Sequence, residues 1–169
     1  LQMELDVGLV RVAGGGVGLL LEDVEGGLEV AREERQLAHY ISPLREAGCR
    51  VSIFIAADQQ QIEAANRIGA QVIELHTGAY CDLHAEGRFE ERDAELERLG
   101  EMASFANSLG LEVHAGHGLT YDTVQPVAAF PEVMELNIGH FLIGEAIFRG
   151  LAPAIEEMRR LMDAMRAPA

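Results

Sequence analysis

The stretch from residue 51 to residue 76, VSIFIAADQQQIEAANRIGAQVIELH, decides the fold. It opens with a short β-branched and aromatic run, Val51–Ile55, of the kind that forms a buried strand. Asp58 is a suitable N-cap for a helix that ends at Gly69, and a second apolar run, Val72–His76, follows it. This order of elements predicts a strand–helix–strand unit and therefore a parallel sheet.

The same alternation continues toward the end of the chain. Apolar runs predict further strands at 111–114 and 134–138, and helical spacing predicts helices at 89–109 and 124–129. A helical region that bends near Gly150 closes the chain. Repeated units of this kind indicate a doubly wound sheet or an eight-fold βα barrel. A complete barrel takes about 250 residues. The 169 residues of this chain are therefore expected to hold only four or five of its units.

The amino-terminal part of the chain is organised differently. A helix is expected over residues 29–47, with a kink or break at Pro43. Before it, residues 1–24 offer one strand candidate at 7–12 and a glycine run at 14–18, in which the dinucleotide-binding spacing G-x-G-x-x-G fails. The sequence thus predicts a lead-in segment over 1–24, which matches the strand–helix pattern poorly, and a single domain of βα units over 25–169.

Composition and charge exclude several classes of protein. Thirteen basic and 28 acidic residues give a formal net charge of -15, which disfavours nucleic acid and anionic membrane as partners. No apolar run has the length of a membrane span, and no secretory signal pattern is visible. Two cysteines, Cys49 and Cys81, do not make a disulfide scaffold. We expect a cytoplasmic protein whose anionic ligands are held by local donors.

Three of the predicted strands end in glycine and histidine. In parallel βα folds the ligand lies at the carboxyl ends of the strands. Glycine lets backbone N–H groups approach an anion, and a helix N-terminus adds a partial positive charge. Histidine moves protons near neutral pH. Unless these glycines only turn the chain, the pattern predicts a phosphate site with an acid or base beside it. The three strand ends are His76-Thr77-Gly78, Gly116-His117-Gly118 and Gly139-His140.

Other chemistry is less well supported by the sequence. Glu74 shares a strand face with His76, where the two are catalytic or ligand-orienting if that face points inward and solvent-facing helix contacts if it points outward. A metal-dependent hydrolase using His76, His117 and His140 is a weaker alternative, because neither Cys-x-x-Cys nor His-Glu-x-x-His occurs. Cys81 falls in a predicted loop with no base beside it, which argues against a cysteine nucleophile.

Six sequence blocks, in order from Glu25 toward the end of the chain, resemble pyridoxine 5'-phosphate synthase, a family of bacterial vitamin B6 biosynthesis. They are Glu25-Gly26-Gly27-Leu28-Glu29-Val30, Val51-Ser52-Ile53-Phe54-Ile55, Gln61-Ile62-Glu63-Ala64-Ala65, Glu74-Leu75-His76-Thr77-Gly78, Ala115-Gly116-His117-Gly118-Leu119-Thr120-Tyr121 and Glu135-Leu136-Asn137-Ile138-Gly139-His140.

The resemblance implies a TIM-type (β/α)8 barrel, of which this chain is about the carboxyl-terminal half. It also implies assembly as a homo-octamer. It implies condensation of 1-deoxy-D-xylulose 5-phosphate with 3-amino-2-oxopropyl phosphate to a pyridine ring, with loss of water and one phosphate. His117 resembles the family's proton donor, and Gly118, Gly139 and His140 resemble the residues that hold the aminoketone phosphate. The resemblance implies no metal and no organic cofactor.

The chain also departs from the family pattern. Leu1-Gln2-Met3 resembles a Leu-Glu-Met strand whose Glu is a catalytic base, so that Gln2 stands at a catalytic position. Asp23-Val24 replaces Thr-Thr, His114 replaces Asn, and Glu145 replaces Arg near the expected phosphate site. The second hypothesis is therefore a non-catalytic phosphate-binding half-barrel that self-associates, because half a barrel exposes sheet edges.

Overall fold

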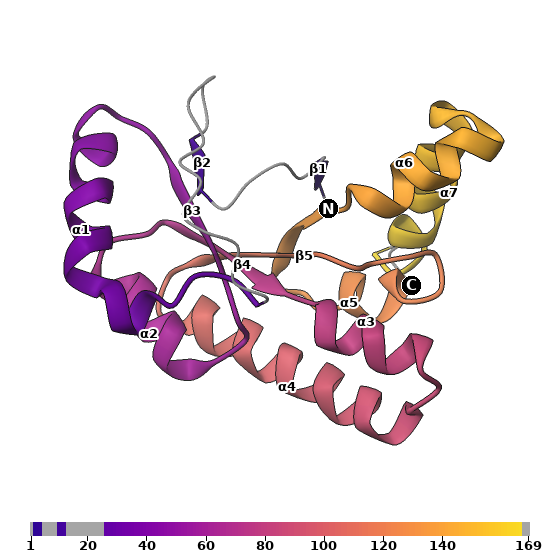
Figure 1. Ribbon diagram of the computed structural model, residues 1–169, viewed down its shortest axis with the longest axis horizontal. Helices are drawn as coiled ribbons and strands as arrows, with labels where there is room; N and C mark the ends of the chain where they lie inside the picture. The colour runs from indigo at the N-terminus through magenta and orange to yellow at the C-terminus, as the bar shows by residue number, and fades with distance from the viewer. Residues whose placement is uncertain (1, 5–9, 13–25, 167–169) are drawn as a thin grey trace.

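The computed structural model describes residues 2–4, 10–12 and 26–166 (Figure 1). Its strands form one sheet in the order β1-β6-β5-β4-β3-β2. The four strands β3 to β6 run parallel to one another. They are β3 (Val51–Ile55), β4 (Val72–His76), β5 (Glu112–Gly116) and β6 (Val133–Asn137). The predicted α/β class with a parallel sheet is confirmed.

Two short strands from the amino-terminal segment pair with the edges of this parallel core. β1 (Gln2–Glu4) runs parallel to β6, and β2 (Val10–Val12) runs antiparallel to β3. β2 forms part of the strand expected at 7–12, whose other residues lie outside the described ones, as does the glycine run at 14–18. Both edges of the parallel core are therefore paired rather than exposed.

Helices follow the strands in the expected alternation, and α1 lies at the opposite end of the molecule from α6 and α7 (Figure 1). Gly150, with φ of +86°, separates α6 from α7 and confirms the predicted bend. The helices are α1 (Val30–Glu46), α2 (Gln59–Arg67), α3 (Gly78–Ala85), α4 (Phe89–Ser108), α5 (Val124–Ala128), α6 (His140–Arg149) and α7 (Leu151–Ala164). No helix in the described ranges is both long and apolar enough to cross a membrane.

The helix boundaries follow local chemistry. The Asp58 carboxylate accepts hydrogen bonds from the backbone N–H groups of Gln60 and Gln61, at 2.9 and 3.1 Å. These bonds satisfy two of the amides that a helix N-terminus leaves without partners. At the other end of α2, Gly69 takes a left-handed conformation with φ of +86°, which costs glycine little. The predicted helix after Asp58 is thus confirmed.

Two predictions about helices are wrong. α1 continues through Pro43, and its non-helical residue is Glu33, with φ of -109° and ψ of 18°. Pro43 has no N–H to donate to the preceding turn, yet the helix continues past it, and the Ala47 N–H donates to the Pro43 carbonyl oxygen at 3.0 Å. Cys81 lies in α3 rather than in a loop. α3 gives little sequence signal because it is short, begins with Gly78 and has no capping side chain.

Strand register divides the side chains of the sheet between two faces. Ile53, Ile73, Val113 and Val133 align as one row, and Ile55, Leu75, Ala115 and Leu136 as another. We call these eight residues the apolar face. The alternating rows contain Phe54, Glu74, His114 and Glu135, then His76, Gly116 and Asn137, and we call these seven residues the polar face.

The apolar face lies at the centre of the hydrophobic core. Its eight side chains are 0 to 2% exposed. Helices α1 and α2 pack on β3, α4 packs on β5, and α5 packs on β6. Each fully buried aliphatic side chain contributes about 1.5–3 kcal/mol of hydrophobic free energy. The apolar face therefore stabilises the sheet, whose carboxyl ends hold the candidate site.

Candidate active site

The carboxyl ends of β4 and β5 are joined by Thr77, which is fully buried. Its backbone N–H donates to the Gly116 carbonyl oxygen at 2.8 Å. Its hydroxyl lies 2.8 Å from the same oxygen and 2.6 Å from the His117 carbonyl oxygen. These contacts hold the turn after β5 against the start of α3.

His117 has an unusual backbone conformation at this turn. It is the one non-glycine residue with a positive φ, 75°, in the described part of the chain. Such a conformation costs a side-chain-bearing residue about 1–3 kcal/mol and persists only where surrounding contacts impose it. Gly118 follows with φ of +87°, and a Cβ atom there would lie 3.1 Å from Cys81 Cβ. The turn thus places an imidazole on an exposed, constrained loop.

Three aromatic rings gather at this end of the sheet. The imidazoles of His76 and His117 stack with centroids 4.7 Å apart and planes at 27°. The Phe54 ring lies 5.2 Å from His76 and 6.1 Å from His117. The Gly78 N–H donates to His76 Nδ1 at 3.2 Å. Burial, and secondarily the nearby His117, lower the pKa of His76, so His76 is neutral near pH 7.

A first pocket, of about 300 Å³, lies between the ends of β5 and β6. It is bordered by the N-terminus of α6, which no side chain caps. The first backbone N–H groups of a helix have no intrahelical partner and attract anions. This pocket is therefore suited to a phosphate group. Its lining residues are His117, Gly118, Leu119, Asn137, Ile138, Gly139, His140 and Phe141.

A second pocket, of about 560 Å³, adjoins the first and shares His117 and Gly118 with it. It is bordered by the first turn of α3, at Gly78 and Ala79, and by Asp82, Glu95 and Arg98. Arg98 donates to the Ala57 carbonyl oxygen and pairs with Glu95, whose hydrogen bond raises the pKa of Arg98. His117 stands at the junction of two pockets, each beside a helix N-terminus.

Most of the residues expected at the site come together around these pockets. His117, Gly118, Gly139 and His140 border the first pocket, and His76 borders the second. Glu74 lies on the same face as His76 but lines neither pocket. It is 5% exposed, and its Oε1 would lie 2.4 Å from a Cβ on Gly116, so the carboxylate occupies space that only glycine leaves open.

Sequence reasoning missed two contributors to the site. Phe54 belongs to a short, mostly apolar strand, and only the folded structure places its ring beside two histidines. Arg98 lies on α4 among many charged residues, so its contact with Ala57 gives no local signal. Glu74 and His76 are two residues apart and therefore share one face of β4. That face continues onto β3 at Phe54, which pairs with Glu74, so this spacing could have pointed to Phe54.

The departures at His114 and Glu145 have local partners. His114 Nε2 lies 2.8 Å from Glu112 Oε1, and its Nδ1 lies 3.5 Å from Glu135 Oε1. The hydrogen bond from Arg50, followed by that from His114, lowers the pKa of Glu112. Glu145 pairs with Arg149 at 2.9 Å and is not among the residues that line the first pocket. His114 thus contacts the carboxylates of Glu112 and Glu135, and Glu145 forms an ion pair with Arg149.

Two alternative chemistries lack a suitable arrangement. Burial raises the pKa of the Cys81 thiol to about 11, so Cys81 is protonated at neutral pH and is a poor nucleophile. No group of three or more His, Cys, Asp or Glu side chains within the described ranges could hold a metal ion. His76 and His117 stack face to face rather than converging on one point.

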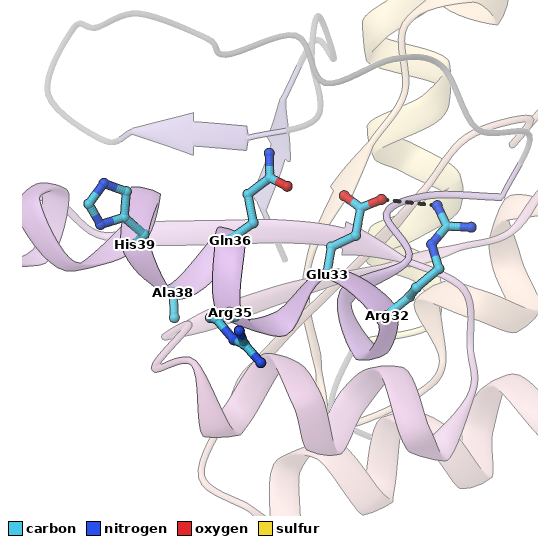
Figure 2. Close-up of a pocket in the computed structure, with 6 residues that line it drawn as sticks. All are labelled: Arg32, Glu33, Arg35, Gln36, Ala38 and His39. Carbon is cyan, nitrogen blue, oxygen red and sulfur yellow. Dashed lines mark hydrogen bonds and ion pairs between the residues drawn. The ribbon is translucent and has the colours of Figure 1, made fainter.

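A separate hollow lies along α1 (Figure 2). All of its described lining residues belong to that one helix, from Arg32 to His39. The Arg32 guanidinium pairs with the neighbouring Glu33 at 2.9 Å, and Figure 2 shows the other side chains fanning out without converging. This hollow shares no residue with the strand-end pockets, which are therefore the candidate site.

Comparison with known proteins identifies the family of the chain. The sequence model of the family described as pyridoxal phosphate biosynthesis protein PdxJ matches residues 22–164. The pyridoxine 5'-phosphate synthase of Roseobacter denitrificans is 83% identical over 143 residues, which are 85% of this chain and 57% of that protein. The enzyme of the same name from Ruegeria pomeroyi is 84% identical over 143 residues, covering 85% and 58% of the two chains. That of Cereibacter sphaeroides is 66% identical over 145 residues, covering 86% and 58%. The chain thus spans little more than half the length of these curated relatives.

Proposed function

The chain belongs to the pyridoxal phosphate biosynthesis protein PdxJ family, and from this premise we propose that it acts as a pyridoxine 5'-phosphate synthase. The reaction condenses 1-deoxy-D-xylulose 5-phosphate with 3-amino-2-oxopropyl phosphate by acid/base catalysis. A pyridine ring closes, with loss of water and one phosphate. The observation that carries the proposal is the position of His117, one titratable side chain at the junction of two pockets.

The first pocket receives the phosphate of the aminoketone. Backbone N–H groups of Gly118, Gly139 and His140, with the N-terminus of α6, are the donors. The proximity of these residues in one pocket supports this assignment. Donors of this kind act locally, so the overall charge of -15 does not prevent anion binding.

His117 is the proton donor of the reaction. Its exposed imidazole borders both pockets, so it reaches atoms of two substrates that meet between them. Schiff-base formation, elimination and ring closure each need a proton moved at a defined atom, a role that histidine fills near neutral pH. Glu74 and His76 are the other candidate site residues, and both lie on the polar face of the sheet.

The complete protein is proposed to form a TIM-type barrel and a homo-octamer. The parallel order of β3 to β6 and the greater length of the relatives support the barrel. In the register of the sheet, Gln2 pairs with Glu135 and so continues the row of Glu74 and His114. We propose that Gln2 occupies the position of the family's catalytic Glu.

Product formation by the purified chain tests the proposal. The chain is supplied with both phosphorylated substrates, and pyridoxine 5'-phosphate is measured by chromatography with fluorescence detection. Product is expected from the unaltered chain and from the control His39→Ala, which changes an exposed residue of α1. His117→Ala should reduce the rate about 10²–10⁴-fold. Saturable phosphate binding without product, in a folded sample, would instead identify a non-catalytic phosphate-binding half-barrel.

A further inference from the structure

His76 is in direct ring contact with the proposed proton donor. We propose that His76 is a positioning residue: as a neutral imidazole stacked on His117, it fixes the orientation of that ring and leaves the catalytic proton to it. This inference rests on the proposed function of His117. It assigns His76 a role distinct from binding substrate phosphate or exchanging protons with substrate.

The geometry constrains His76 from three sides. Its ring stacks on His117 at 4.7 Å and meets Phe54 at 5.2 Å. Its Nδ1 accepts the Gly78 N–H at 3.2 Å, which fixes the rotation of the ring about the side chain. A Cβ at residue 78 would lie 2.3 Å from the His76 ring, so glycine is what allows the ring to lie there.

The same contacts favour the neutral form of the His76 ring. The Nδ1 lone pair of His76 is occupied by a hydrogen bond, so protonation at Nδ1 would break that bond and set two N–H groups against each other. The remaining proton of the neutral ring is then on Nε2. Two imidazolium ions at stacking distance would also repel each other. A neutral ring face beside an imidazolium is favourable by comparison.

Titratable groups from three parts of the fold act on the protonation of His76. His117 faces it from the turn after β5, Asp82 from α3, and Glu95 from α4. Arg98, also on α4, lines the same pocket and pairs with Glu95. The two carboxylates favour protonation of His76, but burial and His117 act against it and have the larger effect.

The test compares His76→Ala, which removes the stacked ring, with His76→Phe, which keeps an aromatic ring. The ring signals of His117 are followed by NMR in the full chain and are identified by their loss in His117→Ala. The matched control is His39→Ala, at an exposed residue of α1. The kcat and KM for the aminoketone phosphate are measured on the same samples, and circular dichroism reports folding.

In His76→Ala the His117 signals should move and kcat should fall about 10-fold, because small misplacements of a catalytic group are costly. KM should change less than about twofold, since the phosphate donors are untouched. His76→Phe should restore most of kcat and return the His117 signals toward their original positions. If His76→Ala does not fold, His76→Phe is compared with the unaltered chain alone. The inference then requires that His76→Phe keep most of kcat and leave the His117 signals near their original positions.

Two results would overturn the inference. One is an unchanged His117 signal and full kcat in folded His76→Ala. The other is a His76→Phe chain as impaired in kcat as His76→Ala, which would give His76 a proton-transfer role instead. The NMR comparison needs no turnover. Absence of product from the unaltered chain would therefore refute the proposed function. The NMR signals of His117 would still show whether His76 orients that ring.

Discussion

The apolar and polar faces of one sheet show how stability and chemistry are divided in this protein. Side chains of the apolar face, such as Ile73 and Leu75, are almost fully buried in the hydrophobic core. On the polar face the same strands hold Glu74, His76 and Asn137. Burying polar groups costs free energy unless they are paired. Burial of the apolar face offsets that cost. The same stabilisation allows the turn at His117 to keep its strained backbone conformation.

The largest effect is expected from breaking the apolar face. Ile73→Ala removes a fully buried side chain from the centre of the sheet and should lower the free energy of unfolding by about 2–5 kcal/mol. Met134 offers a matched control, because it is the extra residue at the β5–β6 register irregularity and is 53% exposed. Urea unfolding of both variants measures the difference. Equal losses for Ile73→Ala and Met134→Ala would contradict the division between the faces.

The next largest effect is expected at Thr77, which links the end of β4 to the turn that carries His117. Thr77→Val keeps the shape of the side chain but removes the hydroxyl that contacts the Gly116 and His117 carbonyl oxygens. Loss of a buried donor should cost about 1–3 kcal/mol of unfolding free energy. The rate of product formation should fall as well, because the turn carrying His117 is no longer held. Normal stability and rate in Thr77→Val would show that the backbone contacts suffice.

A smaller effect should appear within the strained turn itself. His117→Gly removes the imidazole and also relieves the positive φ, whereas His117→Ala removes only the imidazole. The glycine variant should be more stable than the alanine variant by about 1 kcal/mol, while both lack activity. Thermal unfolding of the two variants measures this difference. An alanine variant at least as stable as the glycine variant would argue against strain at this residue.

The smallest effect concerns the pH dependence of stability. The folded pKa of His76 is lowered from its ordinary value of 6.5, so the unfolded chain binds more protons as the solution is acidified. The contribution of neutral His76 to the free energy of unfolding is therefore fully present above pH 6.5. It is lost as the pH falls toward the lowered pKa. Urea unfolding at several pH values should show a shallower loss of stability in His76→Phe. Parallel profiles for the two chains would contradict the lowered pKa.

Much of the fold could be predicted from local patterns. The runs Val51–Ile55 and Val72–His76, with Asp58 as a cap, predicted their elements because apolar periodicity and capping act over a few residues. The expected strand near 111–114 is observed as Glu112–Gly116. α3 and the distortion at Glu33 were not predicted, because tertiary contacts rather than propensity decide them.

The candidate site was only partly accessible to sequence reasoning. Glycine and histidine at the strand ends pointed to His117, Gly118, Gly139 and His140, since parallel strands bring their carboxyl ends together. Three features depend on groups far apart in the chain and leave no local pattern. They are the His76–His117 stack, the positive φ of His117 and the contact of Arg98 with Ala57.

Phosphate binding at the strand ends is the central claim, and an NMR titration of the ¹⁵N-labelled chain with inorganic phosphate tests it most directly. Saturable shifts are predicted for the backbone amides of Gly118, Gly139 and His140, with the α1 amides near His39 as an internal control. Substitution of His117 by Ala should leave these shifts largely in place, because the donors are backbone groups. Amides that do not move at saturating phosphate, or shifts only along α1, would contradict the placement of the site.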